Sequence, residues 1–323
     1  FENQIFGDIV LLDKTVNENI GGSVSLGIKK DSWYGKLRYS EQQFGDYRIP
    51  TDTIIYLTQQ IPIHGRKLKN TAGIERNFNF YSEYKKWRYS SNYAVSNAYQ
   101  KVGFFPGAHG VPDASRIHDD GDNRNIELPH SLVNHFKLTS HQQYMWDNVI
   151  GSWDFGFQNN HREEWSLFHT HYGAQLPPAI DPDKELEFNL DTYSSLVKVK
   201  MLISSLWELD GGWDMQFQNN NIDGYSFLLP AYKRFTSGLF GVVNWNISQD
   251  MLLSGGLRYD YGGVDAKEYK DPYLKDYLHG FGYDDSLLKR YEWRSYSVNR
   301  KFSNLSGSLG IVWSIKNKHL LKS

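Results

Sequence analysis

Histidine and aspartate side chains gather in residues 103–129, a polar segment that is rich in glycine and proline. Imidazole nitrogens and carboxylate oxygens together suit Zn²⁺ or iron. The candidate ligand-binding residues of this type are His109, His118, Asp119 and Asp120. The two aspartates begin part of the pattern of a calcium-binding loop, but the bidentate Glu at the required spacing is missing. The sequence therefore leaves the identity of any bound metal unknown.

A second pair of imidazoles, His169 and His171, lies in the next long polar segment. Alternate residues of an extended chain point to the same side, so these two rings could act together. Two phenylalanines, Phe104 and Phe105, could stack on a flat ligand such as the catechol rings of a siderophore. Each candidate also has a simpler interpretation, because water-exposed loops collect His and Asp, and aromatic residues anchor barrel rims at the lipid headgroups.

The sequence shows no pattern that is typical of an enzyme. It has no Ser-His-Asp order, nucleophile elbow, glycine-rich phosphate loop or paired-carboxylate spacing. We therefore expect no catalytic activity and no cofactor. The absence of cysteine excludes disulfides and thiolate zinc sites, and a net charge of −2 excludes a strongly basic nucleic-acid binder.

The segments that must position these residues alternate between apolar and polar side chains. Trp153, Phe155 and Phe157 alternate with Asp154 and Gln158. The same period of two recurs at residues 213–218, 253–261 and 305–313. Successive strand residues point to opposite faces, so each segment is predicted to be a strand with one apolar and one polar face. Such strands suit a barrel with lipid outside, against the aromatic residues, and water inside.

The composition agrees with an all-β transmembrane barrel, although the mean hydropathy of −0.58 resembles that of a soluble protein. No run of about 18 apolar residues is present, so no transmembrane helix is predicted. Hydropathy does not detect a barrel, because half of each strand faces water. Aromatic residues make up 15% of the chain, as girdles at two membrane interfaces would require.

The predicted connections alternate between short turns and long loops. Short turns are predicted at residues 29–32, 81–83, 147–148, 209–210, 248–250 and 316–318. This alternation predicts roughly a dozen strands in an antiparallel meander, with loops 103–129 and 165–184 at the same rim. A strand that starts at His319 predicts a barrel that does not close, so residues 1–323 are interpreted as one partial barrel domain.

Three short sequences resemble the barrels of TonB-dependent outer-membrane receptors. Residues 255–260 read Gly-Gly-Leu-Arg-Tyr-Asp, a strand common in that family, and residues 70–75 and 156–164 are also similar to its barrel. The resemblance is greatest to receptors of Bacteroidetes-type bacteria for iron complexes. It implies a 22-stranded barrel filled by an N-terminal plug domain. The plug, the TonB-binding segment and the last strands are absent from this chain.

The resemblance also implies a location in the outer membrane of a Gram-negative bacterium. The expected partners are outer-membrane lipid, TonB through segments outside this chain, and a small metal complex. Extracellular loops would capture that ligand, with His109, His118, His169 and His171 contributing.

The expected function is TonB-dependent uptake of a scarce metal complex, such as a ferric siderophore or haem. A passive outer-membrane porin and a surface binding protein without transport are the alternatives. A plug domain would favour the receptor over the porin. The sequence leaves the ligand open between a siderophore complex, haem, cobalamin, zinc and an oligosaccharide.

Overall fold

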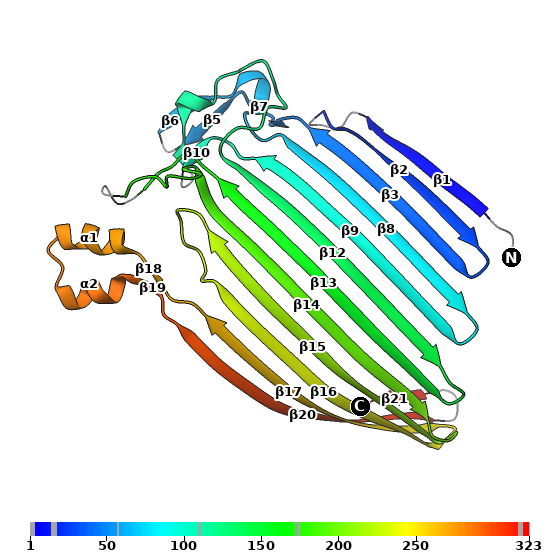
Figure 1. Cartoon of the computed structure of the whole chain (residues 1–323). Coiled ribbons are helices and arrows are strands. Elements are labelled where there is room, and N and C mark those ends of the chain that lie inside the picture. The colour runs from blue at the N-terminus through cyan, green and yellow to red at the C-terminus, as the bar shows by residue number, and fades with distance from the viewer. Residues whose placement is uncertain are drawn as a thin grey trace.

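Antiparallel strands make up most of the molecule. The computed structural model describes residues 4–13, 18–56, 58–108, 111–170, 172, 175–315 and 319–322. Within them, thirteen strands form one sheet in which each strand pairs with the next large strand along the chain (Figure 1). They are β1 (Gln4–Asp13), β2 (Ile20–Lys30), β3 (Trp33–Phe44), β8 (Gly73–Lys86), β9 (Tyr89–Gly103), β12 (His130–Met145), β13 (Val149–Trp165), β14 (Lys184–Leu202), β15 (Trp207–Asp223), β16 (Tyr232–Ser248), β17 (Met251–Ala266), β20 (Val298–Ile315) and β21 (His319–Lys322). The predicted meander is confirmed.

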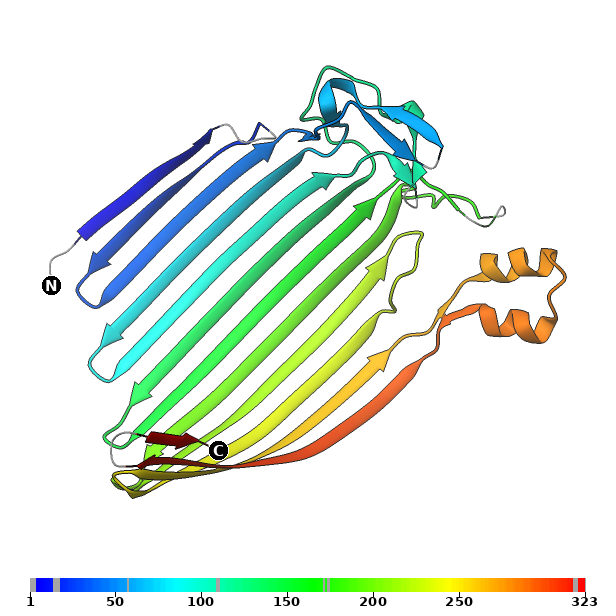
Figure 2. The same cartoon turned by 180° about the vertical axis from the view of Figure 1, so that it is seen from behind.

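The sheet curves into an open arc. Strands β1 and β21 are its two edges and do not pair with each other, and Figures 1 and 2 show the arc from opposite sides. The prediction of an arc that does not close is therefore confirmed. The described residues form no separate domain on the enclosed side of the arc, in agreement with the predicted absence of a plug from this chain.

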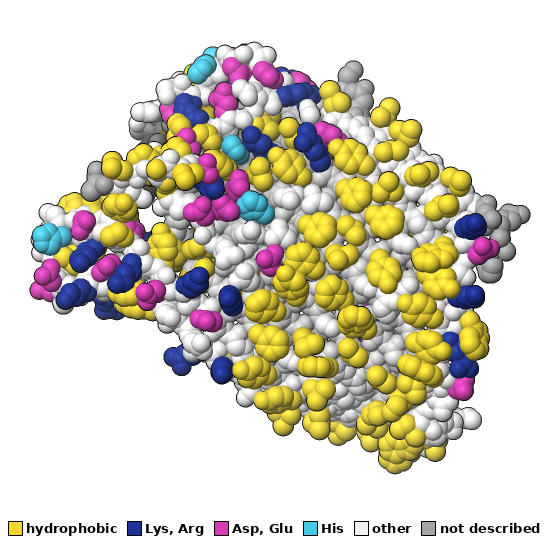
Figure 3. Space-filling model, viewed as in Figure 1, with side chains coloured by type: hydrophobic (Ala, Val, Ile, Leu, Met, Phe, Trp, Pro, Cys, Tyr) yellow, Lys and Arg dark blue, Asp and Glu magenta, His cyan; other side chains and the backbone are white. Residues whose placement is uncertain are grey.

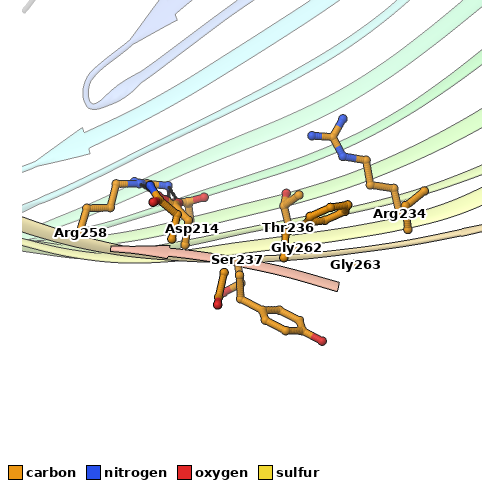
Figure 4. Close-up of a pocket in the computed structure, with 13 residues that line it drawn as sticks. Asp214, Arg234, Thr236, Ser237, Arg258, Gly262 and Gly263 are labelled. Atoms are coloured by element: carbon orange, nitrogen blue, oxygen red, sulfur yellow. Dashed lines mark hydrogen bonds and ion pairs between the residues drawn. The ribbon is translucent and has the colours of Figure 1, made fainter. Parts of the chain in front are cut away.

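The two faces of the sheet differ as the period of two predicts. On the outer face, the rings of Phe157 and Tyr193 lie 4.9 Å apart across β13 and β14, and apolar side chains cover much of the surface in Figure 3. On the enclosed face, Asp214 and Arg258 point into the arc, while Ser237 points outward (Figure 4). The strands thus separate apolar from charged side chains by backbone geometry alone.

Short turns join the strands at one rim, which we call the short-turn rim, and long loops join them at the other, the long-loop rim. Turns 31–32, 146–148 and 249–250 agree with prediction, whereas 316–318 lies outside the described residues. The turn predicted at residues 81–83 is wrong. Strand β8 continues to Lys86 and the chain turns at Trp87, which has a φ of 51°. Trp is an uncommon residue for that left-handed conformation, so the turn left no signal in the sequence.

The turn predicted at residues 209–210 is also wrong, because these residues belong to β15 and the chain turns at residues 203–206. Ser204 and Trp207 make the backbone hydrogen bonds of that turn, with the Trp207 N–H donating to the Ser204 carbonyl over 3.3 Å. Leu209 and Asp210 instead pair with β14, opposite Met201 and Lys200. Leu209 and Asp210 continue the apolar–polar alternation of β15 and do not form a turn.

Small elements occupy the long loops. They are β4 (Tyr47–Arg48), β5 (Thr53–Tyr56), β6 (Gln59–Pro62), η1 (His64–Arg66), β7 (Lys67–Leu68), β10 (Gly107–Ala108), β11 (Val111–Pro112), η2 (Ala114–Arg116), β18 (Tyr269–Lys270), α1 (Pro272–Gly280), α2 (Asp285–Tyr291) and β19 (Trp293–Ser295). The two α-helices extend away from the sheet (Figure 1). Neither is long and apolar enough to cross a membrane, and no other helix of the described residues is.

Candidate functional site

Two groups of loops stand on the long-loop rim. We call residues 45–72 and 104–129 the N-terminal loop cluster, and residues 166–183, 224–231 and 267–297 the C-terminal loop cluster. The segments that the sequence placed at one rim, 103–129 and 165–184, therefore lie at the same rim, as predicted. His109 and His171 lie outside the described residues.

The N-terminal loop cluster has a small apolar core of its own. Ile61, Ile63 and Ile117 are buried against one another, and Phe105 packs on them. Phe104, its neighbour, is 46% exposed. Of the two phenylalanines proposed to stack on ligand, Phe105 thus supports the loop fold, and only Phe104 presents its ring to solvent.

A buried amide joins the segments of this cluster. Asn70 is fully buried, and its Nδ2 donates hydrogen bonds to the backbone carbonyls of Phe104 and Pro129 over 2.8 and 2.9 Å. Its Oδ1 accepts the backbone N–H of Glu127 over 2.6 Å. Both polar atoms of the side chain are therefore hydrogen-bonded to backbone groups, as is usual for buried polar side chains.

The acidic residues of residues 103–129 bind the protein itself. Asp120 pairs with the mostly buried Nζ of Lys69 and accepts the backbone N–H of Asp122 over 3.1 Å. The lysine hydrogen bond holds the pKa of Asp120 well below its usual range. Asp119 accepts the N–H of Gly121 over 2.9 Å. These contacts stabilise the fold of the segment, and Asp119 and Asp120 do not form a shared metal site.

His118 follows the η2 helix and is exposed. Its Nδ1 lies 3.1 Å from the carbonyl oxygen of Ser115, three residues earlier. The structure places His118 and His169 in different loop clusters, so the two histidines do not form one site in the described part of the chain.

The C-terminal loop cluster encloses a cavity of about 210 Å³. All three of its loops contribute, and five of the thirteen lining residues are Tyr or Phe. The lining residues are His169, Thr170, Tyr172, Gln175, Tyr225, Ser226, Phe227, Tyr269, Lys270, Asp271, Pro272, Tyr273 and Arg294. This cavity is the candidate functional site, and His169 is the sequence-predicted candidate that lines it.

His169 and Tyr225 form one wall of the cavity. The Nδ1 of His169 lies 3.0 Å from the Leu167 carbonyl oxygen and 3.2 Å from the Tyr225 hydroxyl, and the two rings meet edge to face. Burial, with a smaller contribution from Glu185, raises the pKa of Tyr225 to about 12. The phenol therefore stays protonated at neutral pH and can act as a hydrogen-bond donor.

Stacked aromatic rings form another part of the lining. Phe227 and Tyr269 stack with ring centroids 4.3 Å apart and planes 20° apart. The neighbouring Lys270 carries its Nζ 4.1 Å from the centre of the Trp293 ring. Such a wall can accept a flat aromatic group, because π-faces stack favourably at these separations.

The charged side chains that line the cavity favour an anion. Lys270 and Arg294 contribute two positive charges, against one carboxylate from Asp271. That carboxylate is engaged as the N-cap of α1, where it accepts the Leu274 N–H over 3.1 Å. A flat anion would therefore meet two cations and no free carboxylate among these lining residues.

The sequence analysis did not identify Tyr172, Tyr225, Phe227, Tyr269, Lys270 or Arg294 as candidate site residues. A usable signal was present at Asp271-Pro272, a helix N-cap followed by proline, which predicts a helix start inside the long loop. The loop connects neighbouring antiparallel strands, so its two ends, near Lys270 and Arg294, are expected to lie close together. They do meet, because β18 pairs with β19.

A second hollow lies on the enclosed face of the sheet, with a volume of about 610 Å³ (Figure 4). At its base Arg258 donates to Asp214 over 2.7 Å and to Asp260 over 2.8 Å. These charged side chains of the enclosed face thus pair with each other. Arg234 also lines this hollow, whose charged lining side chains are therefore two arginines and two aspartates, against two cations and one carboxylate in the loop cavity.

No protein-family model and no curated protein matches the sequence. Solved structures do match the fold. The FrpB iron transporter of Neisseria meningitidis is 13% identical with a TM-score of 0.59, over 96% of this chain and 43% of that one. The ferric yersiniabactin uptake receptor FyuA of Yersinia pestis is 12% identical with a TM-score of 0.56, over 96% and 44%.

A third match is the haemophore receptor HasR of Serratia marcescens, in complex with its haemophore HasA and haem. It is 14% identical with a TM-score of 0.60, over 97% of this chain and 42% of that one. The chain thus spans less than half the length of these three proteins. At such identities the likeness concerns the fold. The chain has the fold of part of a TonB-dependent receptor barrel.

Proposed function

We propose that this chain is part of an outer-membrane receptor that captures a metal complex at its long-loop rim for TonB-dependent uptake. The observation that carries the proposal is the loop cavity, which combines stacked aromatic walls with two cations at that rim. It is built from loops that the barrel strands β13 to β20 bring together.

The sheet supports a membrane location. Its outer face carries an apolar surface and its enclosed face carries ion pairs, which is the arrangement of a barrel with lipid outside and water inside. In this proposal residues 1–323 form one partial barrel domain of a 22-stranded barrel, the short-turn rim faces the periplasm, and a plug fills the lumen.

The cavity suggests the ligand class. A flat anionic group, such as a ferric catecholate or a haem with its propionates, would stack on Phe227 and Tyr269 while Lys270 and Arg294 neutralise its charge. Tyr225 would donate a hydrogen bond to a ligand oxygen in place of its long, 3.5 Å hydrogen bond to the Leu167 carbonyl oxygen. The three similar structures support a metal complex as cargo, since they are an iron transporter, a ferric yersiniabactin uptake receptor and a haemophore receptor in complex with its haemophore and haem.

The remaining candidates of the N-terminal loop cluster have a secondary place in this proposal. Phe104 and His118 are exposed at the same rim and could contact a large ligand first. Asp119, Asp120 and Phe105 are engaged within the loops. We therefore assign capture mainly to the C-terminal loop cluster.

The test is equilibrium binding of a ferric tris-catecholate complex to the native receptor in detergent, followed by quenching of tryptophan fluorescence. We expect the double variant Lys270→Ala/Arg294→Ala to bind at least tenfold more weakly, because each lost charge-assisted hydrogen bond costs about 1.5–3 kcal/mol. The matched control is Arg48→Ala/Lys67→Ala. It removes the same charge at the same rim, where both residues pair with Glu18 outside the cavity.

Equal losses in the two double variants would show that only the overall charge of the rim matters, and would contradict a binding site in the cavity. A steady ionic current through the receptor in planar bilayers, without any ligand binding, would favour the porin instead. Binding without uptake by cells that have active TonB would favour a surface binding protein.

A further inference from the structure

A histidine and two glutamates meet on the outer face of the sheet, near the long-loop ends of β13 and β14. His161 and Glu163 belong to β13 and are two residues apart, so they share a face. Glu187 of β14 lies directly opposite Glu163 in the strand register. The alternation along β13 is unbroken from Phe157 to Glu163, which places this group on the same face as the apolar side chains.

The separations of His161 Nε2 from the two carboxylate oxygens are those of neighbouring ligand atoms in a tetrahedral metal site. His161 Nε2 lies 3.2 Å from Glu163 Oε1 and 3.2 Å from Glu187 Oε1. All three atoms lie within 4.8 Å of one another. Metal–ligand bonds of about 2.0–2.1 Å at tetrahedral angles place neighbouring ligand atoms about 3.3 Å apart. A small metal ion therefore fits between these atoms with little movement of the side chains.

The second oxygen of each carboxylate is already held by the protein. Glu163 Oε2 accepts the indole N–H of Trp165 over 2.7 Å, and Glu187 Oε2 accepts from Lys184 Nζ over 2.8 Å. Each hydrogen bond turns the Oε1 atom of its glutamate toward His161. Outer hydrogen bonds of this kind orient the ligands in known metal sites and commonly affect affinity by 10–100-fold.

The local charge favours the binding of a cation. Two glutamates directly opposite each other in a sheet repel, and their side chains are only 16% and 20% exposed. Lys184 offsets part of this charge, but it also pairs with Asp181 and Asp223 over 3.1 and 3.6 Å. Lys184 thus pairs with three carboxylates, and with Glu163 the group has four carboxylates and one lysine, a net charge of −3 with a neutral imidazole.

We propose that His161, Glu163 and Glu187 bind a divalent transition-metal ion of the Zn²⁺ class, with water in the remaining position. One imidazole with two carboxylates suits such ions better than Ca²⁺ or Mg²⁺, which prefer oxygen ligands alone. The site is distinct from the loop cavity and does not depend on the transported ligand.

The metal would link β13 to β14 where the loop 166–183 begins and ends. Trp165 precedes that loop and Lys184 follows it, and both hold the proposed ligands. The same loop supplies His169 and Thr170 to the cavity. Metal binding would therefore stabilise the base of one wall of the candidate functional site.

The test uses the native receptor in detergent after chelation, titrated with Co²⁺ and then with Zn²⁺. We expect one equivalent of Co²⁺ to give the intense visible band of a tetrahedral site and Zn²⁺ to displace it. The variants His161→Ala and Glu163→Gln should each lower the affinity at least tenfold. Heat-modifiable migration in gel electrophoresis would show that each variant keeps its folded barrel.

The matched control is His141→Ala. His141 Nδ1 lies 2.5 Å from Asp154 Oδ1 on the enclosed face, and it forms a histidine–carboxylate pair with no second carboxylate in ion-pair contact. This variant should bind Co²⁺ like the parent. The absence of a tetrahedral Co²⁺ band in the parent would overturn the proposal and leave His161 as an ion-pair partner of the two glutamates. Equal binding by the His161→Ala variant would also overturn it.

Discussion

The two loop clusters stand on the same rim and contain similar residue types, but their side chains have different partners. In the N-terminal loop cluster, Ile61 and Asn70 are buried and Asp120 is paired with Lys69. In the C-terminal loop cluster, Tyr225 and Phe227 line a cavity that is open to a ligand. In the first cluster these side chains stabilise the loop fold, whereas in the second they line a site that a ligand can enter.

The difference shows why residue type alone is a weak guide to a binding site. An aspartate in a loop can bind a ligand only when its oxygens are not already bonded to the protein. Asp119 and Asp120 both accept backbone N–H groups of their own segment. In the cavity, by contrast, the cation Lys270 lies against an aromatic ring, which leaves its N–H groups available to an anion.

The largest effect is expected from Asn70→Ala in the N-terminal loop cluster. It leaves two carbonyls and one N–H of the buried backbone without partners, at about 1–3 kcal/mol each. Hydrogen exchange in residues 104–129 should speed up by two orders of magnitude or more, while binding at the cavity stays unchanged. The exposed Gln60→Ala is the control in the same cluster. A loss of ligand affinity with unchanged exchange would reverse the roles of the two clusters.

A smaller loss of stability is expected from Asp120→Asn, about 1–2 kcal/mol, because the pair with mostly buried Lys69 is lost but Asp120 is partly exposed. The pKa of Asp120 is lowered by folding. Its contribution is therefore complete above the ordinary carboxyl value of about 3.9 and is lost as the pH falls below it. Limited proteolysis of the loop at pH 7 measures the effect, and pepsin digestion at pH 3 should show a smaller difference between variant and parent. Equal digestion of both proteins at pH 7 would contradict the prediction.

A direct comparison of two histidines tests the assignment of the site. His169→Ala removes a cavity wall and should weaken binding of the ferric catecholate probe about three- to tenfold, the cost of roughly one hydrogen bond. His118→Ala should leave the affinity unchanged, because that ring contacts only its own segment in the structure. The reverse order of the two effects would move the site to the N-terminal loop cluster.

The smallest effect concerns pH and Tyr225. Its pKa is raised to about 12, so the phenol should remain a donor between pH 7 and pH 10, where an ordinary tyrosine begins to ionise. The ratio of probe affinity in the parent to that in the Tyr225→Phe variant should change less than twofold over that range. Because the unfolded phenol ionises first, the local stability falls as the pH rises from about 10 to about 12. A tenfold change in the parent alone below pH 9 would contradict a buried, protonated phenol.

The strands and their faces could be predicted because each depends on neighbouring residues. Period-two alternation around Trp153 and Phe155 predicted β13, and the same pattern predicted most of the other strands. Turns were less predictable. The chain turns at Trp87, a residue with no turn preference. The turn predicted around Ser82 instead lies inside β8. Local composition cannot reveal a turn that neighbouring strand pairs impose.

The candidate site was only partly predictable. His169 was identified from its residue type, but nothing in the sequence joined it to Tyr225, Lys270 or Arg294. These residues come from three loops spread over more than a hundred positions of the chain. Their meeting depends on the sheet order, which brings the ends of β13 to β20 to one rim.

The sequence by itself determined the architecture of this protein, because side-chain alternation and the spacing of short and long connections are local properties that specify an antiparallel meander with one apolar face. The tertiary structure alone decided which loop residues are free to bind. Asp120 and Phe105 became structural because Lys69 and Ile61 reached them from a distant loop. Whether a polar group is hydrogen-bonded or an aromatic ring is packed depends on residues that are remote in the chain. Only the folded sheet determines which residues those are.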